Sequence, residues 1–143
     1  MAERKTQKLL EGLQGDLERE LKAMLQYTYQ ASTLLGVGSL SISPVLREEA
    51  AEELKHIGFL CDQIVGLGGT PKLSTQKFSE ARDLKAMLEN DLDLERESIL
   101  EYRERVKQAE TAGEIGLKVR VEILIAEETE HVRRLERILR GWQ

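Results

Sequence analysis

The pentapeptide EELKH at residues 52–56 recurs as EETEH at residues 127–131, a constant offset of 75 positions. These two segments contain both histidines of the chain, and each histidine follows a glutamate by three residues. Residues three apart lie on one face of a helix, so each glutamate can point in the same direction as its histidine. Further from the pentapeptides, the same offset relates Glu20 to Glu95. We interpret the chain as one helical hairpin used twice.

The composition limits the kind of protein. With 143 residues, 41% apolar and 33% charged, the sequence predicts one domain, residues 1–143, with a single core. The net charge is −5, from 26 acidic and 21 basic residues, and no basic stripe is present, so no nucleic-acid partner is expected. No segment approaches the roughly 18 apolar residues of a membrane span, and the charged start is unlike a signal peptide. We expect a cytoplasmic protein with no membrane partner, in which the single Cys61 is reduced and buried.

Glycine and proline concentrate at three places and divide the chain into four helical segments. The predicted helices run from Thr6 to Leu35, from an N-cap at Ser43 to Gly66, from Ser79 to Ala109, and from a Thr111–Glu114 capping box to Gly141. Between the second and third lies LGGTPKLSTQKF, residues 67–78, which can span on the order of 40 Å, the length of such a helix. The sequence therefore predicts an all-α, antiparallel four-helix bundle with one long crossover between helices two and three.

Each predicted helix has an apolar seam at alternating steps of three and four residues, and one glutamate interrupts every seam. Burial of an unpaired carboxylate is unfavourable, so four in one core require a partner. Two divalent ions would bring four positive charges against the four carboxylates, with the two imidazoles as neutral ligands. The predicted metal ligands are Glu20, Glu53, His56, Glu95, Glu128 and His131.

The ligand types favour particular metals. Oxygen ligands with one nitrogen per ion suit iron or manganese, and the absence of a second cysteine argues against a thiolate zinc site. Six ligands for two ions leave open positions for oxygen, peroxide or water, which makes redox chemistry a candidate function. Tyr27 and Tyr102 each follow a seam glutamate by seven residues; we expect hydrogen bonds to ligand carboxylates, with redox participation as the alternative.

Three further acidic residues fall off the seams and are expected in solvent: Glu52, Glu127 and Glu130. Trp142 ends the fourth seam, where capping of the bundle and a subunit contact both remain open.

These motifs resemble the bacterioferritin branch of the ferritin-like di-iron proteins over nearly the whole chain. The resemblance is carried by LERELKAMLQYTYQA around Glu20, EELKH followed by IVGLGGTP, DLDLE ending at Glu95, and IAEETEH. It implies a ferritin-like bundle with two iron ions per subunit, manganese being possible. Glu53 and Glu128 would bridge the ions, Glu20 with His56 would complete one coordination sphere, and Glu95 with His131 the other. The implied activity is that of an iron-storage ferroxidase, an oxidoreductase that oxidises Fe(II) with oxygen or hydrogen peroxide inside a hollow homo-oligomer.

Three departures qualify that resemblance. Bacterioferritins place a haem-binding methionine directly after the first bridging glutamate, where this chain has Leu54, so haem is not predicted. Their short fifth helix has no counterpart in the twelve residues after His131, which leaves a dimer, a 12-subunit cage and a 24-subunit shell open.

The third departure concerns rubrerythrins, which are similar and also carry the two tyrosines. They have an additional glutamate where this chain has Ser98, and cysteine pairs that this chain lacks. A rubrerythrin-like peroxide reductase without mineral storage is the alternative function, and a metal-stabilised structural bundle without turnover is the third hypothesis.

Overall fold

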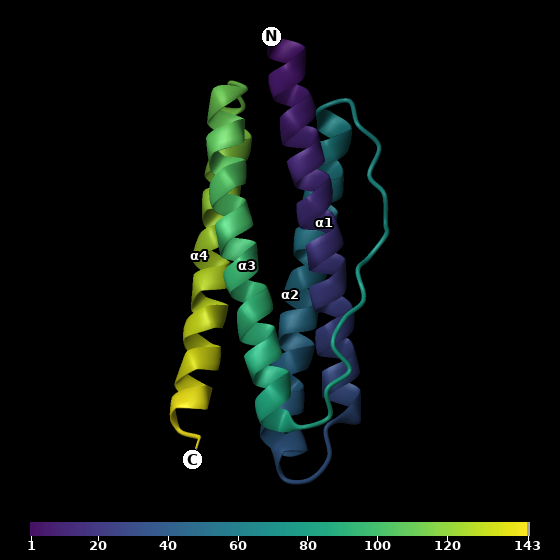
Figure 1. Ribbon diagram of the computed structural model, residues 1–143, viewed down its shortest axis with the longest axis vertical. Coiled ribbons are helices and arrows are strands. Elements are labelled where there is room, and N and C mark those ends of the chain that lie inside the picture. The colour runs from purple at the N-terminus through teal and green to yellow at the C-terminus, as the bar shows by residue number, and fades with distance from the viewer. Residues whose placement is uncertain (143) are drawn as a thin grey trace.

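The computed structural model describes residues 1–142 as a bundle of four long helices (Figure 1). The helices are α1 (Ala2–Thr33), α2 (Gly38–Gly66), α3 (Leu84–Thr111) and α4 (Ile115–Arg140). Two antiparallel hairpins, α1 with α2 and α3 with α4, pack side by side, and α2 runs parallel to α3. The predicted all-α four-helix bundle with one long crossover is confirmed.

The crossing connector, residues 67–83, runs along the outside of the first hairpin from one end of the bundle to the other (Figure 1). Its backbone is fastened to α1 by side chains of that helix. Gln14 donates to the carbonyl of Lys72 at 2.8 Å and accepts from the same residue's N–H at 3.0 Å. Further along, Gln26 accepts from the N–H of Ser79 at 3.0 Å. These bonds satisfy part of a backbone that makes no helical hydrogen bonds.

Both helix starts predicted for the first hairpin were wrong. α1 begins at Ala2 rather than Thr6, and α2 begins at Gly38 rather than at an N-cap at Ser43, so Pro44 lies inside α2. The turn at Gly36, with φ of 83°, lets the N–H groups of Ser39 and Leu40 bond back to Gly36 and Val37 and start the helix early. Because Pro44 has no N–H, the carbonyl of Leu40 in the first turn of α2 lacks its helical donor.

The second hairpin also differs from prediction at its ends. α3 begins after Asp83, whose carboxylate accepts from the N–H of Ala86 at 3.1 Å, and not near Ser79. The Thr111–Glu114 capping box is absent, because Thr111 is the last residue of α3. Instead, the N–H groups of Gly113 and Glu114 bond back to Glu110 and Ala109. This is the Schellman arrangement, which the positive φ of Gly113 permits.

The core is built from the predicted seams. One apolar cluster, which includes Leu9, Leu13, Leu17 and Leu60, fills the end of the bundle where α1 begins. Two smaller clusters, around Tyr27 with Leu46 and around Leu88 with Leu135, fill the other end. The interrupting glutamates lie between these clusters, so the polar region is closed by hydrocarbon above and below.

No helical stretch in residues 1–142 combines the length and the apolar character that a membrane crossing requires. Cys61, predicted as buried, is only half-buried, because it lies beside the seam residue Leu60 and not on the seam itself. Trp142 is 37% exposed.

Candidate metal centre

The side chains predicted to bind metal meet in the middle of the bundle. Glu20 comes from α1, Glu53 and His56 from α2, Glu95 from α3, and Glu128 and His131 from α4. The four glutamates are at most 1% exposed, His56 is 3% exposed, and the His131 side chain is 11% exposed. The helical periodicity that buries the leucines of each seam therefore buries one carboxylate from every helix.

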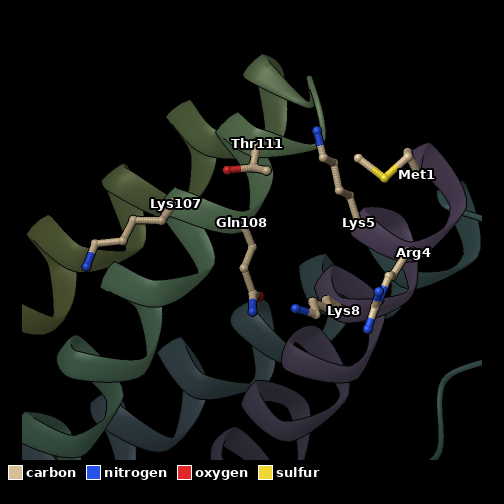
Figure 2. Close-up of a pocket in the computed structure, with 7 residues that line it drawn as sticks. All are labelled: Met1, Arg4, Lys5, Lys8, Lys107, Gln108 and Thr111. Atoms are coloured by element: carbon tan, nitrogen blue, oxygen red, sulfur yellow. The ribbon is translucent and has the colours of Figure 1, made fainter.

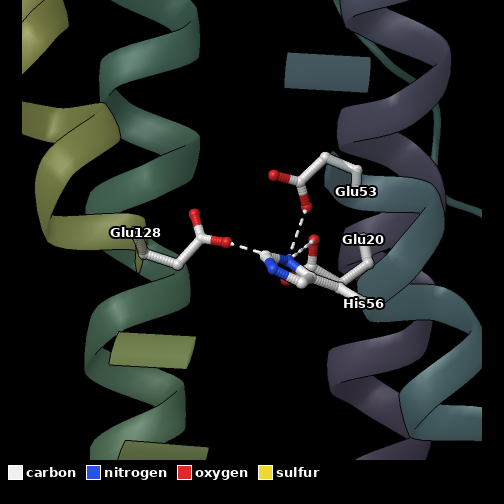
Figure 3. Close-up of side chains that lie close together, drawn as sticks. All are labelled: Glu20, Glu53, His56 and Glu128. Atoms are coloured by element: carbon white, nitrogen blue, oxygen red, sulfur yellow. Dashed lines mark ion pairs between the residues drawn. The ribbon is translucent and has the colours of Figure 1, made fainter. Parts of the chain in front are cut away.

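A first cluster surrounds the Nδ1 atom of His56 (Figure 3). This nitrogen lies 3.1 Å from Glu128 Oε1, 3.5 Å from Glu53 Oε2 and 3.7 Å from Glu20 Oε2. One ligand atom from each of the four residues lies within 4.8 Å of all the others. One cation could therefore contact all four side chains.

A second cluster surrounds the Nδ1 atom of His131. Glu49 Oε2 is 2.8 Å away, Glu128 Oε2 is 3.7 Å away, and oxygens of Glu53 and Glu95 are each 3.9 Å away. Glu49, Glu53, Glu95 and His131 form a second group whose ligand atoms lie within 4.8 Å of one another.

Glu53 and Glu128 stand between the two clusters. Glu53 turns Oε2 toward His56 and Oε1 toward His131, and Glu128 turns Oε1 toward His56 and Oε2 toward His131. Each carboxylate thus offers one oxygen to either side. This is the arrangement that two shared carboxylates need to hold a pair of cations.

The buried polar atoms of the site lack partners. Hydrogen-bond partners are missing for both oxygens of Glu53 and of Glu128, for Oε2 of Glu49 and of Glu95, and for Nδ1 of both histidines. Buried polar atoms are normally paired, and an unpaired buried carboxylate is strongly unfavourable. The orphaned atoms face one another rather than solvent, so this donor set fits a pair of cations with oxygen and imidazole ligands.

Two tyrosines tie the outer carboxylates across the bundle. The Tyr27 hydroxyl of α1 donates to Glu95 of α3, and the Tyr102 hydroxyl of α3 donates to Glu20 of α1. Burial, reinforced by nearby carboxylates, raises the pKa of both tyrosines well above the usual value, so the hydroxyls keep their protons and remain donors. The expected hydrogen bonds between tyrosines and seam carboxylates are present.

Without cations, the histidines carry positive charge. Burial opposes protonation of His56, but the nearby carboxylates of Glu128 and Glu20 outweigh burial and raise its pKa to about 11. Burial likewise opposes protonation of His131, but the nearby carboxylates of Glu128 and Glu49 raise its pKa to about 10. Burial and the repulsion of Glu128 raise the pKa of Glu20. Protons on the imidazoles therefore take over part of the charge balance that cations would supply.

Two acidic residues near the site were missed or misplaced by sequence reasoning. Glu49 was not predicted, yet it is 7% exposed and joins the second cluster. Glu127 was expected in solvent, but its Oε2 lies 2.7 Å from His56 Nε2 and holds the outer nitrogen of that ring. The seam pattern identifies only residues that face the core. The second nitrogen of the His56 imidazole points to the neighbouring helix, so its partner Glu127 lies off the seam. Glu130 was also expected in solvent, and its side chain is 72% exposed. Glu52, for which the same was expected, is half-exposed.

The site is reached from the groove between α2 and α4. A pocket of about 340 Å³ is lined by Glu49 and His131, and another of about 290 Å³ is lined by His56, with Glu52 and Glu127 common to both. A pocket of about 570 Å³ lies at the far end of the bundle, between the start of α1 and the end of α3 (Figure 2). Its charged lining residues are basic, so it is unsuited to a cation.

Comparisons with known proteins agree with this architecture. Residues 10–143 match the family model described as Ferritin: Ferritin-like domain. The chain is 30% identical over 130 residues to the bacterioferritin of Brucella melitensis biotype 1 and 33% identical over 132 residues to that of Rhodobacter capsulatus, covering 90% of this chain and 81% of each relative.

Two solved structures are similar throughout. One is described as ferritin-like, diiron-carboxylate proteins from Bacillus anthracis, with a TM-score of 0.92, 34% identity, and coverage of 94% of this chain and 97% of that one. The other is the Rhodobacter capsulatus bacterioferritin with a metal-free dinuclear site and haem iron, with a TM-score of 0.89, 29% identity, and coverage of 94% and 85%.

Proposed function

Since this chain belongs to the ferritin-like domain family, we propose that it is a ferroxidase that oxidises Fe(II) at the buried pair of clusters and takes part in iron storage. One observation carries the proposal. Glu53 and Glu128 each present one orphaned oxygen to either histidine, in a core otherwise closed by apolar side chains. Two Fe(II) ions, as substrate, satisfy those oxygens and offset most of the negative charge of the buried carboxylates.

The residues divide the work. Glu20 with His56 would hold one Fe(II), Glu95 with His131 would hold the other, and Glu53 and Glu128 would each offer one oxygen to either ion. Each Fe(II) gives up one electron, so the pair supplies the two electrons that reduce O₂ with two protons to H₂O₂, or H₂O₂ with two protons to two waters. Carboxylate oxygens are hard ligands that stabilise the Fe(III) product.

The surroundings support the same reaction. Tyr27 and Tyr102 fix the outer carboxylates by donating to them, and Glu127 fixes the ring of His56 through its second nitrogen. Fe(II) enters, and Fe(III) leaves, through the groove between α2 and α4, where the two pockets reach the histidines. Manganese fits the same ligands. We propose iron as the native metal because the similar curated proteins are bacterioferritins.

Storage requires an assembly. We propose a cytoplasmic homo-oligomer whose subunits deliver Fe(III) to a shared interior. Haem is not part of the proposal, because Leu54, 59% exposed on α2, has no sulfur ligand to offer.

Aerobic titration of the metal-free protein with Fe(II) tests the proposal. A storage ferroxidase takes up many irons per chain as a soluble oxidised particle, and light scattering on the same sample reports a particle of many subunits. Glu53→Ala should abolish paired binding and rapid oxidation, whereas Glu97→Ala, which removes an exposed carboxylate from α3, should leave both unchanged. Binding of iron without oxidation would leave only a structural role for the metal.

A rubrerythrin-like peroxide reductase is the second candidate. The tyrosine–carboxylate pairs are the feature that favours it, and the similar Bacillus anthracis protein is described only as a diiron-carboxylate protein. Such an enzyme stops near two irons per chain and turns over with hydrogen peroxide. Iron uptake beyond two per chain therefore separates the two functions.

A further inference from the structure

We propose that Glu49 is an additional ligand for the metal ion on the His131 side, so that the two metal positions are unequal. The inference rests on the proposed function only in requiring that a pair of cations binds in the site. It goes beyond the six predicted ligands, and it assigns a role to a carboxylate that stood outside the seam pattern.

The position of Glu49 supports direct ligation. It lies on α2 one helical turn before Glu53, is 7% exposed, and turns Oε2 into the site. That oxygen has no hydrogen-bond partner, although it lies 2.8 Å from His131 Nδ1, which has none either. Its ligand atom falls within 4.8 Å of those of Glu53, Glu95 and His131, so one ion can contact all four.

Arg134 fixes the other oxygen of the same carboxylate. Its Nη1 lies 3.2 Å from Glu49 Oε1, on the solvent side of the pocket between α2 and α4. The carboxylate is therefore held at one oxygen by a guanidinium and has the other free for a cation. Glu48, the preceding residue of α2, lies 3.9 Å from the same Nη1, and its side chain is 74% exposed.

The internal duplication shows that the other position lacks such a ligand. At the offset of 75, the counterpart of Glu49 is Leu124, an apolar residue of α4 that is 6% exposed. Counting the shared carboxylates on both sides, the His56 position has Glu20, Glu53, His56 and Glu128. The His131 position has Glu49, Glu53, Glu95, His131 and Glu128. The ion beside His131 thus has one more anionic oxygen.

The charge of the site also differs between the His56 and His131 positions. Five carboxylates face two ions, so two divalent cations leave one negative charge in the site, and Arg134 lies beside the carboxylate that supplies it. Among the carboxylates that face the two enclosed positions, the additional one lies at the His131 end, whereas Glu127 meets the outer nitrogen of His56. We therefore expect the ion at that end to bind more tightly and to be the first to fill.

Anaerobic titration of the metal-free protein with Mn(II) tests this inference without any turnover, because the EPR signal of free Mn(II) reports how much is bound. Wild type should bind two ions per chain, one of them more tightly. Glu49→Gln and Glu49→Leu, the latter copying Leu124, should still bind two ions but with the tighter class weakened about tenfold or more. Glu48→Gln removes the same charge from the adjacent residue and should bind like wild type.

A crystal structure of the Mn(II)-loaded wild type gives an independent readout that needs no variant. Glu49 Oε2 should lie about 2.0–2.2 Å from the ion beside His131, the distance typical of carboxylate ligands on divalent ions. An oxygen that stays beyond hydrogen-bond distance from the ion overturns the inference.

The outcomes separate the two proposals. If wild type binds fewer than two ions, the paired site and the proposed function fail together with this inference. If wild type binds two ions and Glu49→Gln binds them equally well, only the role of Glu49 fails. Equal weakening in Glu48→Gln and Glu49→Gln would reveal a general charge effect and would also overturn the ligand assignment.

Discussion

Each histidine of the site carries a proton that an incoming cation must displace. With pKa values raised to about 11 for His56 and about 10 for His131, both imidazoles are protonated at pH 7 in the metal-free protein. Binding of two metal ions at pH 7 should therefore release at least two protons, one from each ring. Calorimetric Mn(II) titrations in buffers of different ionisation enthalpy measure this number directly.

The same protons give the expected pH dependence. Because about one proton leaves per ion, the apparent affinity should rise about tenfold per pH unit through the neutral range and level off above the raised pKa values. Binding enthalpies that do not depend on the buffer would contradict the assigned protonation states.

Tyr27 offers a second test at the level of one side chain. Tyr27→Phe removes the donor to Glu95 and leaves a buried carboxylate oxygen unpaired, so the affinity for metal at the His131 end should fall about 10–100-fold. Tyr29→Phe, on the same helix at a half-buried position against Phe78, serves as the control and should leave the affinity unchanged. An unchanged affinity with slower Fe(II) oxidation would instead assign Tyr27 a redox role.

Helical periodicity was enough to predict most side chains of the site. It could not decide between adjacent residues that can both face the core. Glutamates in apolar seams identified the four central carboxylates, and all six predicted residues lie together in the core, while their role as ligands stays a prediction. Steps of three and four residues allow either Ala50 or Glu49 to face inward before Glu53. Of these two, Ala50 is half-buried and Glu49 is buried. Only the neighbouring α4, with His131 and Arg134, decides between them.

At the scale of elements, α1 and α3 are joined by two aspartates related by the same offset of 75, each of them fully buried. Asp16 accepts from Arg105 at 2.7 and 3.0 Å and from Arg19 at 2.9 Å. Asp91 instead accepts from the amides of Gln26 and Gln30, both at 2.8 Å. Two copies of one residue thus meet two cations in one half and two neutral amides in the other.

This difference predicts opposite effects of substitution. Asp16→Ala removes the buried carboxylate that two buried guanidinium groups share, and it should lower the free energy of unfolding by about 3–5 kcal/mol. Asp91→Asn keeps an acceptor for the amides and should raise the free energy of unfolding at pH 8 by on the order of 1 kcal/mol. Urea denaturation of both variants measures these changes.

The sign at Asp91 follows from its pKa, which burial raises from 3.8 to about 7 despite the hydrogen bonds from Gln26 and Gln30. Between those two values the folded protein holds a proton that the unfolded chain has released. Stability from this group therefore falls as the pH rises through that window. Asp91→Asn should remove this fall, and a variant no more stable than wild type at pH 8 would contradict the account.

Helix ends were harder to predict than the helices themselves. The signals at Ser43, Ser79 and Thr111 are all residues that cap helices well, but none of them caps one here. Ser79 lies in the connector instead. Its N–H donates to Gln26 of α1, and its hydroxyl accepts from Asn90 of α3. The local sequence identifies residues that could cap a helix, but the packing of the turn determines which residue does so.

For the whole molecule, the long crossover was predictable because its length must match that of a helix, whatever its conformation. The candidate metal site brings together five buried glutamates, whose charge cations would offset, so metal should be a main determinant of global stability. At a Mn(II) concentration 100 times Kd, each occupied position should add about 2.7 kcal/mol. Thermal unfolding should then shift upward by on the order of 5–10 °C per position.

Scanning calorimetry of the metal-free protein with and without Mn(II) measures this shift. Glu53→Ala should melt at the same temperature with and without the ion, because it lacks a carboxylate shared by both positions. A wild-type melting temperature that does not respond to Mn(II) would contradict a site in the core.

A single segment without helical structure connects the hairpins, and its residues 72–77 are exposed, so trypsin can reach Lys72 and Lys77. Cleavage there cuts no helix, yet it separates the residues that supply Glu20, Glu49, Glu53 and His56 from those that supply Glu95, Glu128 and His131. The nicked molecule becomes a heterodimer whose two polypeptides share one coordination centre. Chelation should then cause the fragments to dissociate on dilution, while the uncut chain stays whole, and size-exclusion chromatography would distinguish the two.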